Sequence, residues 1–331
     1  MAETSRSTAD LIVECLENEG VTHVFGIPGE ENIHLVEAIS RSSIRYVLTR
    51  HEQGASFMAE TYGRLTGRAG VCSATLGPGA INLLLGTADA TTNSTPLIAL
   101  SAQVGMNRSF KESHQGVDLV AMFTPAVKWS ALVATPGAVP EMIRKAFKLA
   151  QTERPGAVYL AVPEDVDQAP APVQGAPLPV NVPRADEPSP EQVERAAVLL
   201  RAARRPIVLA GHGVARAGAA PALRRFAEIM GIPVATTFHG KGVFPDDHPL
   251  ALGAVGRFGD TPGRAAGICR HPRRQGQILA FGGGQARRGI VHRRICKKRS
   301  GPHPRKDFRA RHPKPDRPRT RNPGKGPLQN G

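Results

Sequence analysis

Five short apolar runs in the first half of the sequence constrain its fold more than any other feature, because a segment with helical periodicity separates most of them from the next. A strand that is apolar on both faces has to be covered on both sides, as in a parallel sheet between two layers of helices. The sequence therefore predicts an α/β fold with a doubly wound parallel sheet. The predicted strands are residues 21–25, 44–49, 70–75, 96–101 and 157–162.

Residue types at the ends of the helical segments indicate where these helices begin and end. Ser7 or Thr8 is expected to cap the first helix. A longer helix is predicted over residues 51–66, with Gly67 as its stop. The Leu-Gly-Pro-Gly segment 76–79 is predicted as a turn that leads into an apolar helix.

The alternation of strands and helices restarts after a segment of different composition. Residues 166–189 are rich in proline, alanine and acidic residues, which is typical of a linker. Residues 1–165 are therefore expected to form one α/β domain, and residues 190–256 the beginning of a second, incomplete one. The elements predicted there are a helix ending at residue 203, a strand at 206–210, a helix at 215–230 and a strand at 233–237.

The charge of the sequence is distributed unevenly. The whole chain has a net charge of +15, whereas residues 257–331 contain 21 Lys and Arg against 3 Asp and Glu, so the rest is slightly acidic. The periodicity stops at the same point, and Arg, Lys, Gly, Pro and His dominate this basic tail. Because such a composition builds no core, we expect disorder there. Its charge alone would bind nucleic acid nonspecifically.

Two interpretations of the basic tail stay open. Arg, Pro, Gly, Ala and His are what GC-rich codons give when they are read out of frame, so the tail is interpreted first as a frameshifted or misannotated translation. The alternative is a non-catalytic α/β protein with a basic arm for nucleic acid. The arm offers few aromatic residues for base stacking, among them Phe281 and Phe308, and contains no recognisable RNA- or DNA-binding module.

Simpler features exclude other classes of protein. No apolar run reaches the roughly 18–20 residues that span a membrane, and the polar start of the sequence lacks the pattern of a secretory signal. The four cysteines have no close spacing, so neither a disulfide framework nor a metal site is predicted. We expect a soluble, cytoplasmic protein without a membrane partner.

Three segments that follow predicted strands carry the residues of greatest chemical interest. Glu52 begins a helix after the second strand, and glycine-rich turns at 26–29 and 76–79 follow the first and third strands. Ligands of parallel sheets bind at the carboxyl ends of strands, and such turns let backbone approach a ligand closely. Taken singly, Glu52 is more simply a solvated first-turn acid, and each turn a tight connection. Taken together, they indicate one site.

The segments VFGIPGEEN, RHEQGASFMAETYGRLTG and GVCSATLGPGAINLLLGTADA resemble the thiamine-diphosphate-dependent enzymes related to the acetolactate synthase large subunit. The resemblance covers residues 8–165, as the pyrimidine-binding domain, and continues more loosely over 190–256, as the start of the central domain. It implies a carboligase that decarboxylates pyruvate and joins the product to a second 2-keto acid. Another thiamine-dependent 2-keto-acid decarboxylase is the alternative.

The resemblance also implies roles for individual residues. Glu52 matches the carboxylate that contacts N1′ of the cofactor's aminopyrimidine and shares a proton with it, whereas His51 is expected to be structural. Gln115 matches a glutamine that reaches toward the thiazolium and substrate. The preceding His114 resembles the flavin-independent branch, with a loop histidine of no chemical role as the equal alternative. The residues that match the walls of the pyrimidine pocket are Pro28, Gly29, Thr75, Pro78, Gly79 and Asn82.

The resemblance also implies cofactors and an assembly, but this sequence contains only some of the motifs that they require. A further domain holds the diphosphate through Mg2+ with a Gly-Asp-Gly motif, and the sequence contains no such motif. The chain is therefore predicted to be a truncated copy with little or no turnover. The resemblance implies a homodimer or homotetramer. The segment 211–213 lies where some members bind FAD, which is left open.

Overall fold

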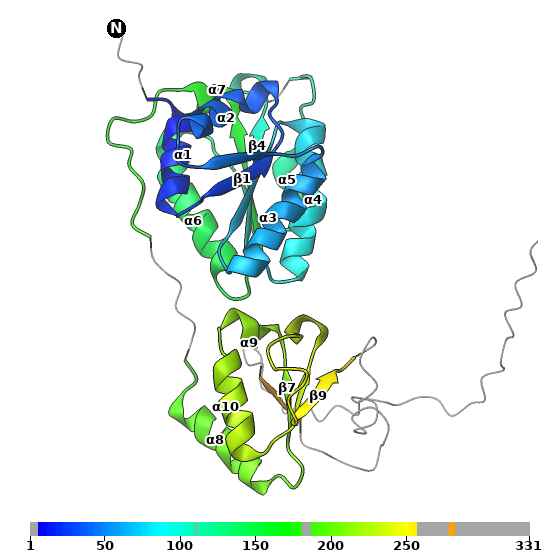
Figure 1. Ribbon diagram of the computed structural model, residues 1–331. Coiled ribbons are helices and arrows are strands. Elements are labelled where there is room, and N and C mark those ends of the chain that lie inside the picture. The colour runs from blue at the N-terminus through cyan, green and yellow to red at the C-terminus, as the bar shows by residue number, and fades with distance from the viewer. Residues whose placement is uncertain (1–5, 110, 181–186, 257–277, 282–331) are drawn as a thin grey trace, which may run out of the picture. The chain divides into compact units, whose positions relative to one another are not determined.

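The computed structural model describes residues 6–109, 111–180 and 187–256, together with the backbone of residues 278–281. These residues form two parallel sheets, one in each half of the described chain. Figure 1 shows both sheets with their helices. The prediction of an α/β fold with a doubly wound parallel sheet is confirmed.

The first sheet has six strands in the order β2-β1-β3-β4-β6-β5, and all neighbouring strands are parallel. All five predicted strands agree with the structure to within one or two residues at each end, and the largest difference at a strand start is in β1, which begins two residues later than predicted. The edge strand β5 was not predicted. The strands are β1 (His23–Gly26), β2 (Arg45–Leu48), β3 (Gly70–Ala74), β4 (Leu97–Gln103), β5 (Trp129–Leu132) and β6 (Ala157–Pro163).

Helices cover both faces of this sheet (Figure 1). One face packs against α1 (Thr8–Asn18), α2 (Ile33–Ser40), α6 (Val139–Gln151) and α7 (Glu164–Gln168). The other face packs against α3 (Glu52–Thr66), α4 (Gly77–Thr92) and α5 (Leu119–Phe123). The short 3-10 helices η1 (Glu30–Asn32), η2 (Met106–Arg108) and η3 (Pro136–Ala138) lie in the connections.

The two faces of the sheet are packed with side chains of different size. Along β3, Val71 belongs to the core under α1 and α6, whereas the next residue, Cys72, belongs to the core under α3 and α4. The second core is rich in alanine, which lets α3 and α4 approach the sheet closely. The two helices also meet closely, since a Cβ added at Gly86 of α4 would lie 2.3 Å from Ser56 Oγ of α3.

The ends of the helices confirm some expectations and correct one. Ser7 caps α1 in a capping box with Asp10, and Gly67 ends α3 with a left-handed φ of 71°. The predicted turn over residues 76–79 is wrong from Gly77 onward, because α4 already begins there. Pro78 is accommodated in the first turn of the helix, where its missing N–H would have no intrahelical partner.

The second sheet has four parallel strands in the order β10-β7-β8-β9. The single predicted helix over 215–230 is wrong, because the chain forms two helices with Gly218 between them at a φ of 59°. The elements are α8 (Pro190–Ala202), β7 (Ile207–Ala210), α9 (His212–Arg216), α10 (Ala220–Met230), β8 (Val234–Thr236), η4 (Phe238–Gly240), β9 (Ala251–Ala254) and β10 (Ile278–Phe281).

Strand β10 lies inside the predicted basic tail and pairs with β7 from Ile278 opposite Ile207 to Phe281 opposite Ala210. The expectation of disorder is therefore wrong for these four residues, whose apolar sequence allows them to extend the sheet. The rest of the tail, residues 257–277 and 282–331, lies outside the described residues.

Candidate active site

The candidate residues lie where three neighbouring strands end. The order β2-β1-β3 places the carboxyl ends of these strands side by side. Pro28 and Gly29 follow β1, Glu52 follows β2, and Thr75 follows β3. The parallel arrangement thus brings together segments that are far apart in the sequence, at the edge where ligands of α/β sheets bind.

Glu52 is held at the start of α3. His51 is the N-cap residue of this helix, and its Nδ1 accepts a hydrogen bond from the Gln53 backbone N–H at 3.1 Å. The structural role expected for His51 is thereby explained. The half-buried Glu52 carboxylate lies in the first turn of α3, where the helix dipole favours a negative charge.

Asn82 of α4 fixes one oxygen of this carboxylate. Its Nδ2 donates to Glu52 Oε2 at 3.0 Å. Gly79, one turn earlier, leaves space beside the other oxygen, because a Cβ added there would lie 3.5 Å from Glu52 Oε1 and 2.8 Å from Thr75 Cγ2. Gly79 and Asn82 near the start of α4 therefore lie against Glu52 in the first turn of α3, and Oε1 is left without a hydrogen bond from them.

Thr75 joins these residues to the turn that follows β1. A Cβ added at Gly29 would lie 2.5 Å from Thr75 Cβ, so only glycine allows this approach of the turn. Thr75 Oγ1 donates to Glu31 Oε2 at 2.6 Å. The structure therefore brings Gly29, Thr75, Gly79, Asn82 and Glu52 into one continuous set of contacts.

Two residues of this arrangement were missed by the sequence interpretation. Glu31 accepts from Thr75, and the buried Asn32 accepts from the Gly29 backbone N–H at 2.6 Å through its Oδ1. Asn32 Nδ2 also donates to the Ile27 carbonyl at 3.4 Å. The signal that could have revealed them is the polar Glu-Glu-Asn directly after the glycine-rich turn.

The remaining candidates, Pro28, Pro78, His114 and Gln115, are exposed. Gln115 has a left-handed φ of 54°, and its backbone lies against the start of α4, since a Cβ added at Gly77 would lie 2.7 Å from the Gln115 carbonyl oxygen. His114 is exposed and makes no hydrogen bond, ion pair or ring contact with the described residues.

A tyrosine lies beneath the site. A Cβ added at Gly26, the last residue of β1, would lie 2.5 Å from the hydroxyl of Tyr46 in β2. Burial raises the pKa of Tyr46, and the negative charge of Glu52 acts in the same direction. The phenol is therefore a neutral group.

Comparison with known proteins shows the family of the chain. Residues 6–122 match the family described as thiamine pyrophosphate enzyme, N-terminal TPP binding domain, and residues 193–267 match the central domain of the same enzymes. The chain belongs to the thiamine pyrophosphate enzyme family. The central-domain match runs beyond residue 256, where the sequence interpretation ended the second domain.

Two curated relatives carry the same activity in their names. A probable acetolactate synthase large subunit of Methanocaldococcus jannaschii is 41% identical over 259 residues, which cover 76% of this chain and 43% of the relative. The acetolactate synthase large subunit of Corynebacterium glutamicum is 40% identical over 259 residues, 76% of this chain and 41% of the relative. The chain thus spans less than half the length of these relatives.

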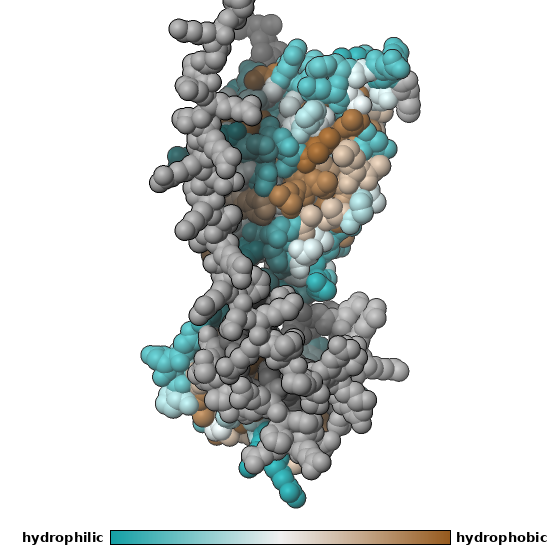
Figure 2. Space-filling view, turned by 90° about the vertical axis from the view of Figure 1, so that its right-hand side faces the viewer, coloured by the Kyte–Doolittle hydropathy of each residue, from teal (hydrophilic) through white to brown (hydrophobic). Residues whose placement is uncertain are grey.

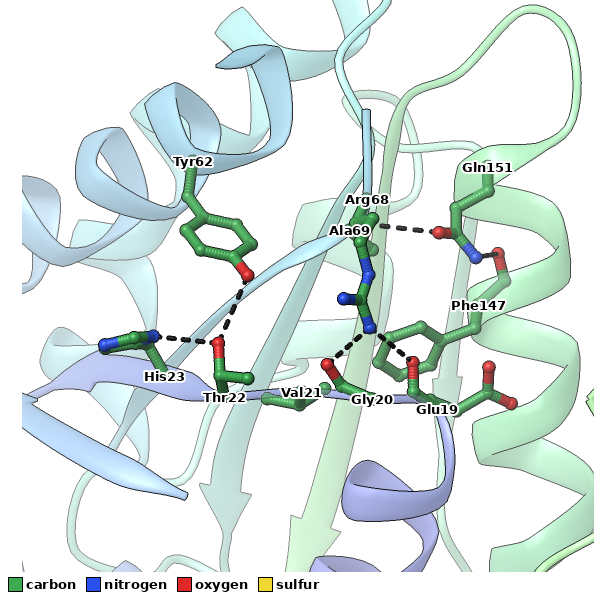
Figure 3. A pocket seen from close by; sticks show the side chains of 10 residues that line it. All are labelled: Glu19, Gly20, Val21, Thr22, His23, Tyr62, Arg68, Ala69, Phe147 and Gln151. Carbon is green, nitrogen blue, oxygen red and sulfur yellow. Dashed lines mark hydrogen bonds between the residues drawn. The ribbon is translucent and has the colours of Figure 1, made fainter. Parts of the chain in front are cut away.

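A small pocket lies at the other edge of the sheet (Figure 3). It is lined by residues that precede β1 and β3, and its volume of about 10 Å³ leaves room for about one water molecule. Arg68 donates across it to the Gly20 carbonyl at 2.5 Å. Because it lies at the amino ends of the strands, it is separate from the candidate site. Its lining is Glu19, Gly20, Val21, Thr22, His23, Tyr62, Arg68, Ala69, Phe147 and Gln151.

Two further properties concern metals and membranes. Among the residues that the structure describes, no three His, Cys, Asp or Glu side chains are close enough to hold a metal ion. In the same part of the chain, no helix combines the length and the apolar character needed to cross a bilayer.

Proposed function

We propose that this chain carries the aminopyrimidine half of the active site of an acetolactate-synthase-like carboligase. The proposed reaction decarboxylates pyruvate and condenses the product with a second 2-keto acid. The observation that carries the proposal is the Glu52 carboxylate, held through Oε2 by Asn82 while Gly79 leaves the space beside Oε1 open. The names of the relatives support the choice of reaction.

The residues of the site fit an aminopyrimidine ring. Glu52 Oε1 accepts no hydrogen bond within the described ranges, so we assign it to hold the proton shared with the ring nitrogen N1′. Gly29 and Gly79, which a Cβ would crowd, let the backbone line the ring closely. Bound thiamine diphosphate would supply the electron sink for the loss of CO2.

We propose that the exposed candidates contact the substrate or line its way to the cofactor. Gln115 is proposed to reach toward the thiazolium and the 2-keto acid, and its position against Gly77 at the start of α4 supports this role. His114, exposed on the same loop, is proposed as a second contact. Pro28 and Pro78 are proposed to line the entrance to the pyrimidine pocket.

We propose that these 331 residues alone catalyse the reaction slowly or not at all. Its sequence contains no Gly-Asp-Gly, the motif through which the family holds Mg2+ and the diphosphate. Thiamine diphosphate and Mg2+ are therefore the proposed cofactors of the activity, of which this chain supplies the pyrimidine contacts. FAD binding and the cytoplasmic location stay predictions.

We propose a second copy of this chain, or a related subunit, as the partner. The solvent side of α3 and α4 carries the exposed apolar residues Met58, Leu65 and Leu85, with 48%, 81% and 55% of their surface accessible. Figure 2 views this side and shows apolar side chains gathered in a band on the first domain. Such a band supports an interface with another subunit.

A chimera tests the reaction. Residues 6–165 replace the matching segment of the Corynebacterium glutamicum relative, and the chimera is assayed with pyruvate, thiamine diphosphate and Mg2+. We expect acetolactate, and its loss in the Glu52→Gln chimera. Acetaldehyde as the main product would instead favour the alternative, a simple 2-keto-acid decarboxylase. A folded chimera that releases neither product would contradict both.

A further inference from the structure

Gln103 ends the interior strand β4 with a buried amide group. Its Oε1 accepts from the Val104 backbone N–H at 2.9 Å, and its Nε2 donates to the Val117 carbonyl at 3.0 Å. Only this orientation of the amide fits both neighbours, because Val104 offers a donor and Val117 an acceptor. One buried polar side chain thus joins the two ends of the connection between β4 and α5.

This connection carries two of the candidate site residues. It consists of residues 104–109 and 111–118 within the described chain and is called the β4–α5 loop here. His114 and Gln115 lie on a turn in which the Gly116 N–H donates to the Ser113 carbonyl at 3.1 Å. Val117 follows directly after this turn. The hydrogen bond from Gln103 to Val117 therefore acts close to the residue that we propose to face the substrate.

The end of the loop lies against the start of α4. A Cβ added at Gly77 would lie 2.7 Å from the Gln115 carbonyl oxygen and 2.8 Å from Gln115 Cβ. Leu76, the N-cap residue of α4, packs with Val104 in a small buried cluster. Because Val104 is also the residue whose N–H binds Gln103, the amide ties the end of the loop to this part of α4.

Gln115 has a backbone conformation that needs such a hold. Its φ of 54° lies in the left-handed region, which a residue with a Cβ adopts only where the surrounding structure imposes it. The Val117 side chain is exposed, so the hold acts through its carbonyl, which accepts from Gln103 and, at 2.9 Å, from the N–H of the buried Leu119. Gln115 is thus placed between the contact with Gly77 and this doubly bonded carbonyl.

The beginning of the loop is held by a different side chain. The backbone N–H groups of Met106 and Asn107 donate to the Asp165 carboxylate at 3.0 and 3.4 Å. These contacts precede Gln115 by more than one turn of the chain and do not involve Val117. Asp165 therefore offers a comparison, since it holds the same loop at a point away from the candidate site.

We propose that Gln103 is a positioning residue of the candidate site, which holds Gln115 against the start of α4 by binding the Val117 carbonyl. The hold on the loop is a property of the fold alone. Its consequence for the 2-keto acid rests on the proposed function, in which Gln115 reaches toward the substrate.

Hydrogen exchange of the full 331-residue chain tests the hold. Gln103→Met keeps the length of the side chain and removes both hydrogen bonds. Gln103→Glu keeps an acceptor for Val104 and, when ionised, offers no donor to Val117. In both variants we expect the protection of amides in residues 113–119 to fall about fivefold relative to residues 157–162 of β6, as for the loss of one hydrogen bond. The Val104 N–H should lose protection only in Gln103→Met.

The matched control is Asp165→Ala, which should lower the protection of residues 106–108 and leave residues 113–119 unchanged. Unchanged protection of residues 113–119 in the Gln103 variants would overturn the proposal, as would a loss spread equally over β6. An Asp165→Ala loss at residues 113–119 as large as that of Gln103→Met would also overturn it. If Gln103→Glu does not fold because it buries a charge, Gln103→Met decides.

The chimera of residues 6–165 tests the consequence for the site. Gln103→Met is expected to lower its kcat/KM for pyruvate about tenfold, because a small displacement of an acting group costs up to about 100-fold. The Kd for thiamine diphosphate should stay unchanged, since Glu52 and Asn82 lie outside the loop. An unchanged kcat/KM in an active chimera would overturn this consequence. A wild-type chimera without activity would contradict the proposed function and leave the exchange result standing.

Discussion

The contact between α3 and α4 gives the sharpest stability prediction, because both helices carry a residue of the site. A Cβ added at Gly86 would lie 2.3 Å from Ser56 Oγ and 2.8 Å from the Ser56 backbone carbon. The backbone carbon cannot rotate away, so the helices must separate by about 1 Å to restore van der Waals distances. Overpacking of this kind costs about 1–3 kcal/mol.

Gly54 provides the matched control on α3. A Cβ added there meets nothing within 4 Å. Alanine in place of glycine inside a helix contributes about 1 kcal/mol at either position, so this gain cancels in the comparison. Gly54→Ala is therefore expected to be more stable than Gly86→Ala by about 1–3 kcal/mol.

Urea unfolding, followed by the fluorescence of Trp129, the single tryptophan, measures this difference. Equal free energies of unfolding, or a more stable Gly86→Ala, would refute the close packing of the two helices. The separation of α3 from α4 should also lengthen the contact between Asn82 and Glu52. Gly86→Ala is thus expected to weaken the site as well as the fold.

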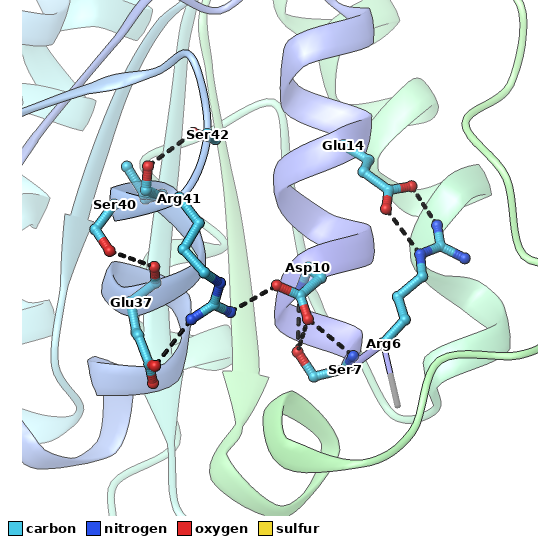
Figure 4. Close-up of polar contacts among 9 residues, drawn as sticks. Arg6, Ser7, Asp10, Glu14, Glu37, Ser40, Arg41 and Ser42 are labelled. Atoms are coloured by element: carbon cyan, nitrogen blue, oxygen red, sulfur yellow. Dashed lines mark hydrogen bonds and ion pairs between the residues drawn. The ribbon is translucent and has the colours of Figure 1, made fainter. Parts of the chain in front are cut away.

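Three further predictions follow from single contacts. Ser7→Ala removes the capping box of α1 (Figure 4) and should cost about 1 kcal/mol in urea unfolding; an unchanged midpoint would contradict the cap. Burial raises the pKa of Asp167 in α7 to about 7, so the free energy of unfolding should fall from pH 4 to 7 by up to about 4 kcal/mol relative to Asp167→Asn; the same pH dependence for both in urea titrations would contradict this. Asn82→Ala releases Glu52 Oε2 and should raise the Kd for thiamine diphosphate about tenfold in NMR titrations, with an unchanged Kd counting against the contact.

The sheet of the first domain could be predicted because its central strands are buried on both faces and read as continuous apolar runs. Both edge strands are only partly buried, but β2 contains the apolar run Tyr46–Leu48, whereas Ser130 interrupts the apolar residues of β5, so β5 was missed. The start of α4 was misplaced because Gly77, Pro78 and Gly79 are typical of turns, although proline also suits the first turn of a helix.

Only those residues of the candidate site that belong to a recognisable motif could be predicted from the sequence. Glu52, Gly29, Thr75, Gly79 and Asn82 are marked by their positions after strands and by the resemblance. Asn32 and Glu31 were missed because their partners, Gly29 and Thr75, depend on how the turn folds back and on which strands are neighbours.

The central claim, that Glu52 and its neighbours form an aminopyrimidine site, is tested most directly by saturation-transfer NMR on the 331-residue chain with thiamine diphosphate. We expect transfer to the aminopyrimidine protons of the cofactor in the wild-type chain and in Glu141→Gln, a control at an exposed glutamate of α6. We expect this transfer to be lost in Glu52→Gln. Transfer that is absent from the wild-type chain, or equally strong in Glu52→Gln, would contradict it.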